Sequence, residues 1–129
     1  MYHVVMGVGP DDDQAAAKAS AVVDLPHAPE AVEVTVVHVS DDPAFDPTTV
    51  PAVTETLDRL QRAGVEATVE VVDAGPTDAV LETADAVDAD CLCVGGRRRS
   101  PAGKLQLKTG TQQVILGTDL PVLVAGQAD

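Results

Sequence analysis

Short apolar runs alternate with amphipathic segments along this chain. The runs are rich in valine and end near glycine or polar residues, which is typical of buried strands. They predict strands over residues 2–8, 32–40, 65–73, 91–94 and 121–125. In the segments between them, helix-forming residues and apolar positions three or four apart predict helices over residues 11–25, 48–63, 77–87 and 111–116.

This order of elements predicts an α/β fold. Strands separated by helical crossovers cannot pair as hairpins, so they form a parallel sheet with helices on both faces. We expect a single doubly wound, Rossmann-like domain over residues 1–129, with a five-stranded parallel sheet. Residues 65–73 alternate between apolar and polar side chains, which favours an edge strand. Ligands of such folds bind at the carboxyl ends of the central strands, so the loops after the first and fourth strands are the candidates for function.

Charge is distributed unevenly along the chain. With 21 acidic and 8 basic residues, the net charge is -13, which disfavours nucleic acid and anionic membranes as partners. Five of the basic residues fall between positions 97 and 108, a window without acidic residues that carries +5. The remainder, with three basic against 21 acidic residues, carries -18. The cluster favours an anion site, although a solvated loop or ion pairs with neighbouring carboxylates would explain it as well.

Several polar and ionisable residues have ordinary structural explanations. The run Asp11–Asp13 opens a predicted helix, where carboxylates cap free amides and complement the helix dipole, and we favour this role over a metal site. Cys91 and Cys93 have neither redox-motif nor zinc-site spacing and are expected to be reduced core thiols. His38 is expected to be structural rather than catalytic. Because the N-terminus lacks a secretory pattern and no apolar run is long enough to span a membrane, a cytoplasmic protein is expected.

The segment after the fourth predicted strand, GGRRRSPAGKLQLKTGT, has the composition of a phosphate-binding loop. Glycines let backbone amides approach an anion closely. Gly110 and Thr111 open the next predicted helix, whose N-terminus supplies further amides and a positive dipole end. Neither the Walker order G-x-x-x-x-G-K-[ST] nor the dinucleotide fingerprint G-x-G-x-x-G occurs. No convincing nucleophile, general base or carboxylate pair accompanies the loop, so no catalytic residue is expected.

Residues 95–111 resemble the signature of the universal stress protein family, G-x2-G-x9-G-[ST]. Gly95 matches its first glycine and Gly110-Thr111 its final pair, and the resemblance covers nearly the whole chain in length and element order. The segment GGRRRSPAGK is similar to that of salt-adapted archaeal members. Arg98 stands at the second signature glycine, and two extra residues precede Gly110. Gly9 stands where nucleotide-binding members carry an aspartate.

The resemblance implies an adenine nucleotide alpha hydrolase-like fold and a stress-response protein that acts as a sensor or regulator. It would bind an adenine nucleotide, ATP with Mg²⁺ or AMP, at the Gly95–Thr111 loop, with at most slow ATP hydrolysis. A homodimer through the last strand, Val122–Ala125, is also implied. The implied binding residues are Gly7, Val8, Val39, Gly95, Arg98, Arg99, Lys104, Gly110, Thr111 and Gln112.

The departures from the signature leave a second reading open. In this alternative the protein is a dimeric interaction module whose degenerate pocket binds no nucleotide and no cofactor. The composition adds one expectation that is independent of either reading. With 15 Asp, 6 Glu and 3 Lys, the chain suits a protein that works in concentrated salt, where charge repulsion is screened.

Overall fold

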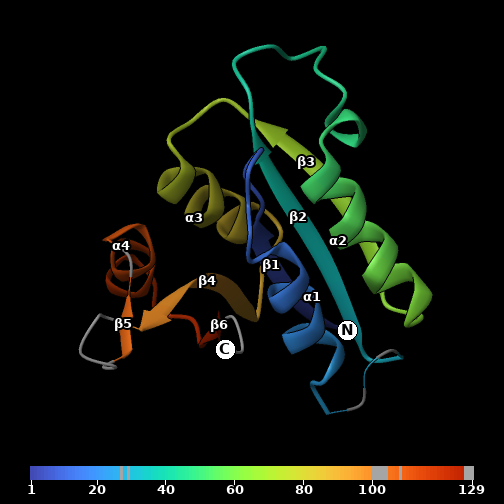
Figure 1. The fold of residues 1–129 in the computed structure, drawn as a ribbon, viewed down its shortest axis with the longest axis vertical. Coiled ribbons are helices and arrows are strands. Elements are labelled where there is room, and N and C mark those ends of the chain that lie inside the picture. Colours follow the sequence, from blue (N-terminus) through green and yellow to red (C-terminus); the bar gives the residue numbers. More distant parts are fainter. Residues whose placement is uncertain (27, 29, 100–104, 108, 127–129) are drawn as a thin grey trace.

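The computed structural model describes residues 1–26, 28, 30–99, 105–107 and 109–126. In this part of the chain a twisted sheet is packed between two pairs of helices (Figure 1). The strands are β1 (Tyr2–Gly7), β2 (Val32–Val39), β3 (Glu66–Val72), β4 (Cys91–Arg99), β5 (Leu105–Leu107) and β6 (Val122–Gly126). The helices are α1 (Ala15–Val23), α2 (Pro51–Arg62), α3 (Pro76–Ala86) and α4 (Thr109–Gly117), with a 3₁₀ turn, η1, at Pro47–Thr49.

Five strands run parallel in the order β3-β2-β1-β4-β6, which confirms the predicted fold class. Val4 of β1 lies between Val34 of β2 and Cys91 of β4 in the hydrogen-bonded register. The chain proceeds from β1 to β2 and β3 on one side, and places β4 and β6 on the other. The strand order therefore reverses between β1 and β4, which is where ligands of open α/β sheets bind. β3 lies at an edge, as its alternating pattern predicts.

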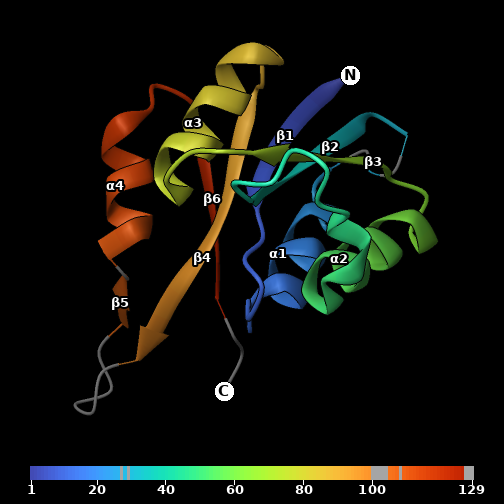
Figure 2. The same cartoon turned by 90° about the horizontal axis from the view of Figure 1, so that it is seen from above.

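Alternation along the strands divides the core into two layers. Val4 and Met6 of β1 pack with α1 and α2 on one face, whereas Val5 packs with α3 and α4 on the other. Figure 2 shows the two helix pairs on opposite sides of the sheet. The core is aliphatic because the chain holds one Phe, one Tyr and no Trp. None of the helices in the described residues is long and apolar enough to cross a membrane.

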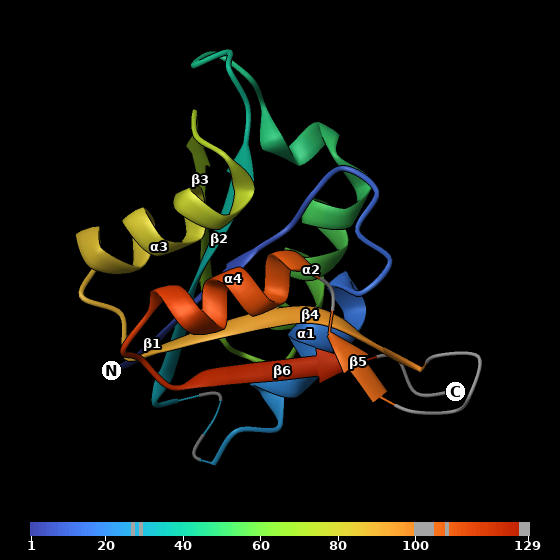
Figure 3. The same cartoon turned by 90° about the vertical axis from the view of Figure 1, so that its left-hand side faces the viewer.

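β4 is longer than the sequence pattern predicts. The apolar run ends at Val94, but the strand continues to Arg99, and its last three residues pair antiparallel with β5. The register with β6 shifts between Val94 and Arg97, where Gly96 adopts a φ of 93°. A glycine with positive φ in a strand produces such a bulge and redirects the chain. The expected loop after residue 94 is therefore partly a hairpin, seen at the end of β4 in Figure 3.

The first helix begins four residues later than predicted. α1 begins at Ala15 and has no acidic residue in its first turn. The prediction that Asp11–Asp13 form the first turn of the helix and complement its dipole there is therefore wrong. The run lies in the preceding loop, where an Asp12 carboxylate oxygen accepts the Gln14 N–H at 2.9 Å. This hydrogen bond closes a local turn that presents the loop toward the carboxyl end of the sheet.

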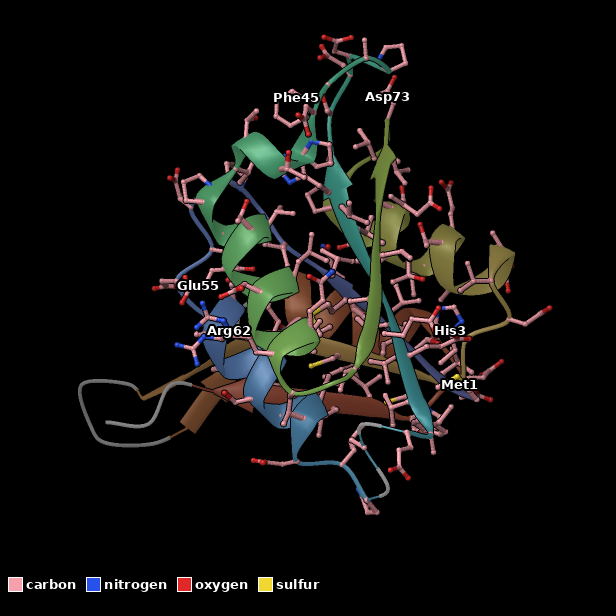
Figure 4. The ribbon with its side chains drawn as sticks, turned by 90° about the vertical axis from the view of Figure 1, so that its right-hand side faces the viewer. Met1, His3, Phe45, Glu55, Arg62 and Asp73 are labelled. Carbon is pink, nitrogen blue, oxygen red and sulfur yellow. The ribbon has the colours of Figure 1, made fainter. Side chains whose placement is uncertain are left out.

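The carboxyl ends of β2 and β3 lie at the end of the molecule where Figure 4 shows Phe45 and Asp73, far from His3. His38, near the end of β2, is buried and its Nδ1 lies 2.8 Å from the Val8 carbonyl oxygen. Its ring stacks on Phe45 with centroids 5.4 Å apart. These contacts hold the loop after β1 against β2, which gives His38 a structural role.

Candidate functional site

A crevice of about 540 Å³ lies at the carboxyl ends of β1 and β4. Its walls come from the loop after β1, the ends of β2 and β4, and the first residues of α3 and α4. This is the point at which the strand order reverses. Helices α3 and α4 both begin here, so their unpaired amides face the same region.

Six of the residues that the family resemblance implies line this crevice, although they come from four separate segments. They are Gly7, Val8, Val39, Gly95, Gly110 and Thr111. Gln112 does not line it, because its exposed side chain donates to the Leu107 carbonyl oxygen at 2.9 Å. The backbones of Arg98 and Arg99 pair with β5, and Lys104 lies outside the described residues.

The crevice has an apolar wall made of valines. Val37, Val80 and Val114 are buried, and Val39 is 37% exposed. Gly7 is needed for this packing, since a Cβ there would lie 2.9 Å from Val80 Cγ2. A smooth aliphatic wall of this kind fits a flat ring better than a charged group.

A buried lysine, Lys18, also lines the crevice. The residue is 5% exposed, and its Nζ donates to the Gly7 carbonyl oxygen and to an Asp12 carboxylate oxygen, both at 2.5 Å. One ammonium thus joins the end of β1 to the loop that follows it. The sequence contains a signal for this role, because Lys18 lies in an Ala-rich stretch and is the single lysine outside the basic window. The motif comparison alone does not point to Lys18, because this lysine lies outside the signature.

Gln14 was also missed, although it makes a direct contact with the signature loop. Its side-chain oxygen Oε1 accepts the backbone N–H of Gly96. A Cβ at position 95 would lie 3.1 Å from the Gln14 Cβ and closer still to Oε1. The absence of a side chain at Gly95 therefore lets Gln14 lie across the backbone of β4.

Thr111 connects the start of α4 to β4. Its hydroxyl donates to the Gly95 carbonyl oxygen, and the residue is 8% exposed. Gly110, immediately before it, is exposed, and a Cβ added there would find no atom outside the helix backbone within 4 Å. The amide groups at the N-terminus of α4 are thereby held at a fixed position beside Gly95.

Most of the charged residues that line the crevice, within the described part of the chain, are acidic. They are Asp11, Asp12 and Asp13, with Lys18 as the basic residue. Burial raises the pKa of Cys93, which also lines the crevice, to about 12, so its thiol stays protonated and unreactive near neutral pH. The described residues contain no group of three or more His, Cys, Asp or Glu side chains placed to hold a metal ion.

Residues 1–126 match the family model described as the universal stress protein family. The chain belongs to the universal stress protein family. A comparison with curated protein sequences gives no match.

Solved structures of the same family are similar over almost the full chain. A universal stress protein from Archaeoglobus fulgidus is 27% identical, with a TM-score of 0.73 over 97% of this chain and 98% of that one. A universal stress protein in complex with cAMP is 25% identical, with a TM-score of 0.72 over 98% of this chain and 97% of that one. A family protein from Arabidopsis thaliana with AMP bound shares the fold at 12% identity, with a TM-score of 0.67, covering 99% and 93% of the two chains.

Proposed function

We propose that this universal stress protein binds an adenine nucleotide in the crevice between β1 and β4 and acts as a sensor or regulator. The observation that carries the proposal is the crevice itself. It places the end of β1, Gly95 and the start of α4 around one space of about 540 Å³. Ligand pockets for small molecules and cofactors have volumes of roughly 300–1,000 Å³, so the space suits a nucleotide.

The chemistry of the walls supports an orientation for the ligand. The adenine ring would lie against the valine wall near Gly7, Val8 and Val39. The ribose hydroxyls would face the carboxylates of the loop after β1, since carboxylates accept hydrogen bonds from a diol. The phosphates would face Gly110 and Thr111, where backbone amides at the start of α4 favour an anion. Arg98, Arg99 and Lys104 would add charge, with Mg²⁺ as the counter-ion of ATP.

The relatives support the choice of adenine. Similar universal stress proteins have been solved in complex with cAMP, with AMP and, for an Archaeoglobus fulgidus protein, with dAMP. The crevice offers a binding surface built from valines, glycines and the aspartate run Asp11–Asp13. In this proposal regulation comes from binding. A ligand that contacts β4 and α4 together would bias the conformation of the segment between them and the surface offered to partners.

Mass analysis of freshly purified protein, combined with thermal unfolding, tests this function. We expect a copurified adenine compound, or a rise in unfolding temperature with millimolar AMP or ATP and Mg²⁺ but not with GTP. The absence of both a copurified nucleotide and a thermal shift contradicts the proposal. The double variant Gly9→Asp with Arg98→Gly restores two family positions and is expected to tighten binding.

A specific observation favours the second candidate, an interaction module that works as a dimer. Within the described residues, β6 pairs only with β4, so its outer edge carries main-chain groups that can pair with another strand. We propose that two copies associate through Val122–Ala125 whether or not nucleotide binds. Light scattering in molar salt is expected to give the mass of a dimer, and a monomer at all concentrations would refute this assembly.

A further inference from the structure

The amide of Gly96, in the signature loop, already has a side-chain partner inside the protein. Gln14 Oε1 accepts its hydrogen. Gly96 lines the crevice, and its amide lies where the strand bulges out of register with β6. An amide in this position would otherwise be available to a ligand oxygen.

The packing around Gly95 shows that this contact is built into the fold. Gln14 is 7% exposed and directly precedes α1, while Gly95 lies in the middle of β4. Any side chain at position 95 would collide with Gln14. The first signature glycine therefore accommodates a glutamine of the same chain.

The surroundings of Gln14 also disfavour a phosphate chain at this point. Lys18 directs its ammonium to Asp12 and to the Gly7 carbonyl oxygen. Asp11 and Asp13 also line the crevice. A phosphate that approached Gly96 would have to replace a hydrogen bond already made and come close to carboxylates, so it would gain little.

We propose that Gln14 weakens phosphate binding by occupying the Gly96 amide, so that the crevice recognises a ligand mainly through its adenosine part. This inference rests on the proposed adenine site and adds the class of ligand. In the native protein the affinities for adenosine, AMP and ATP should differ less than in Gln14→Ala, because the phosphates lack the Gly96 amide and contact the start of α4 without it. Removing the Gln14 acceptor frees a charge-assisted hydrogen bond for phosphate.

The test compares adenosine, AMP and ATP by calorimetric titration of the native protein and of Gln14→Ala. We expect Gln14→Ala to bind ATP about tenfold more tightly and adenosine within twofold of the native value. Gln14→Glu keeps the acceptor and adds a charge, so its ATP affinity should fall below the native value. Gln61→Ala, the same change at an exposed position of α2, should match the native protein for every ligand. Equal changes for adenosine and ATP in Gln14→Ala, or no change, would overturn the proposal.

A second measurement separates this inference from the proposed function. The amide resonance of Gly96 is followed by NMR during titration with inorganic pyrophosphate. We expect a dose-dependent shift in Gln14→Ala and none in the native protein. If no variant binds any adenine compound, the proposed function fails, and the pyrophosphate result alone decides the role of Gln14. A resonance that does not respond in Gln14→Ala refutes that role. If Gln14→Ala does not fold, Gln14→Met removes the acceptor with little change in volume and takes its place.

Discussion

The Lys18 ammonium and the Asp12 carboxylate form a short ion pair, 2.5 Å long, between two residues that line the crevice. Their side chains are only 6% and 13% exposed, and the ammonium also donates to the Gly7 carbonyl oxygen. Removing either partner would leave the other charge buried and unpaired, because little water reaches this position to solvate it. The pair thus fixes the loop after β1 relative to the strand it leaves.

Replacing Lys18 by methionine should destabilise the protein strongly. Lys18→Met leaves the Asp12 carboxylate unpaired and the Gly7 oxygen without its donor, which should lower the free energy of unfolding by about 3 kcal/mol. Chemical denaturation measures the change. Lys18→Met with Asp12→Asn should recover part of it. Arg62→Met removes an exposed partner of Asp58 and should change stability by less than about 0.5 kcal/mol. A loss no larger than that of Arg62→Met would show that the buried pair is unimportant.

Adding one methyl group at Gly7 should also destabilise the protein, for a steric reason. The new Cβ would lie 2.9 Å from Val80 Cγ2, so Gly7→Ala should lower the free energy of unfolding by about 1–3 kcal/mol. Gly9→Ala is the matched control, because nothing lies within 4 Å of a Cβ there, and it should be nearly neutral. In a double-mutant cycle, Val80→Ala should offset part of the Gly7→Ala loss. Strict additivity would exclude this contact as the cause.

The buried Cys93 thiol predicts a loss of stability at alkaline pH. Burial raises the pKa of Cys93 from 9.0 in the unfolded chain to about 12 in the folded protein. The contribution of the protonated thiol to the free energy of unfolding is therefore complete below pH 9. It falls as pH rises toward 12, by up to about 1.4 kcal/mol per pH unit. Unfolding measured from pH 8 to 10.5 should show a steeper decline for the native protein than for Cys93→Ala. Parallel curves would contradict the assigned pKa.

Salt should stabilise the protein, because like charges lie close together on its surface. Glu33 of β2 and Glu66 of β3 are register partners, and like charges at such positions repel each other. We expect Glu66→Gln to raise the free energy of unfolding by about 0.2–1 kcal/mol in 0.05 M KCl, and by almost nothing in 2 M KCl, where charges are screened. The native protein, with a net charge of -13, should also unfold at higher temperature in 2 M KCl. A salt-independent unfolding temperature would argue against salt adaptation.

Much of the fold could be predicted from local sequence patterns. Valine-rich runs separated by helical segments specify parallel strands, and the alternating run at 66–72 specifies an edge. The extension of β4 could not be predicted in this way, because it depends on a bulge at Gly96 and on pairing with Leu105–Leu107. The start of α1 was misplaced for a similar reason. Asp12 accepts from Gln14 and Lys18, and these contacts hold the aspartate run in a loop.

The sequence alone determined the alternation of five parallel strands with four helices, the doubly wound fold class and the position of the signature glycines, because local patterns carry each of these. Only the tertiary structure brought Gln14 to Gly96, 82 positions away, and buried Lys18 beside Gly7. Such contacts depend on which helix packs over which strand, and the periodicity of apolar residues does not specify that packing. A motif therefore located the loop, while packing decided that one of its amides is already occupied.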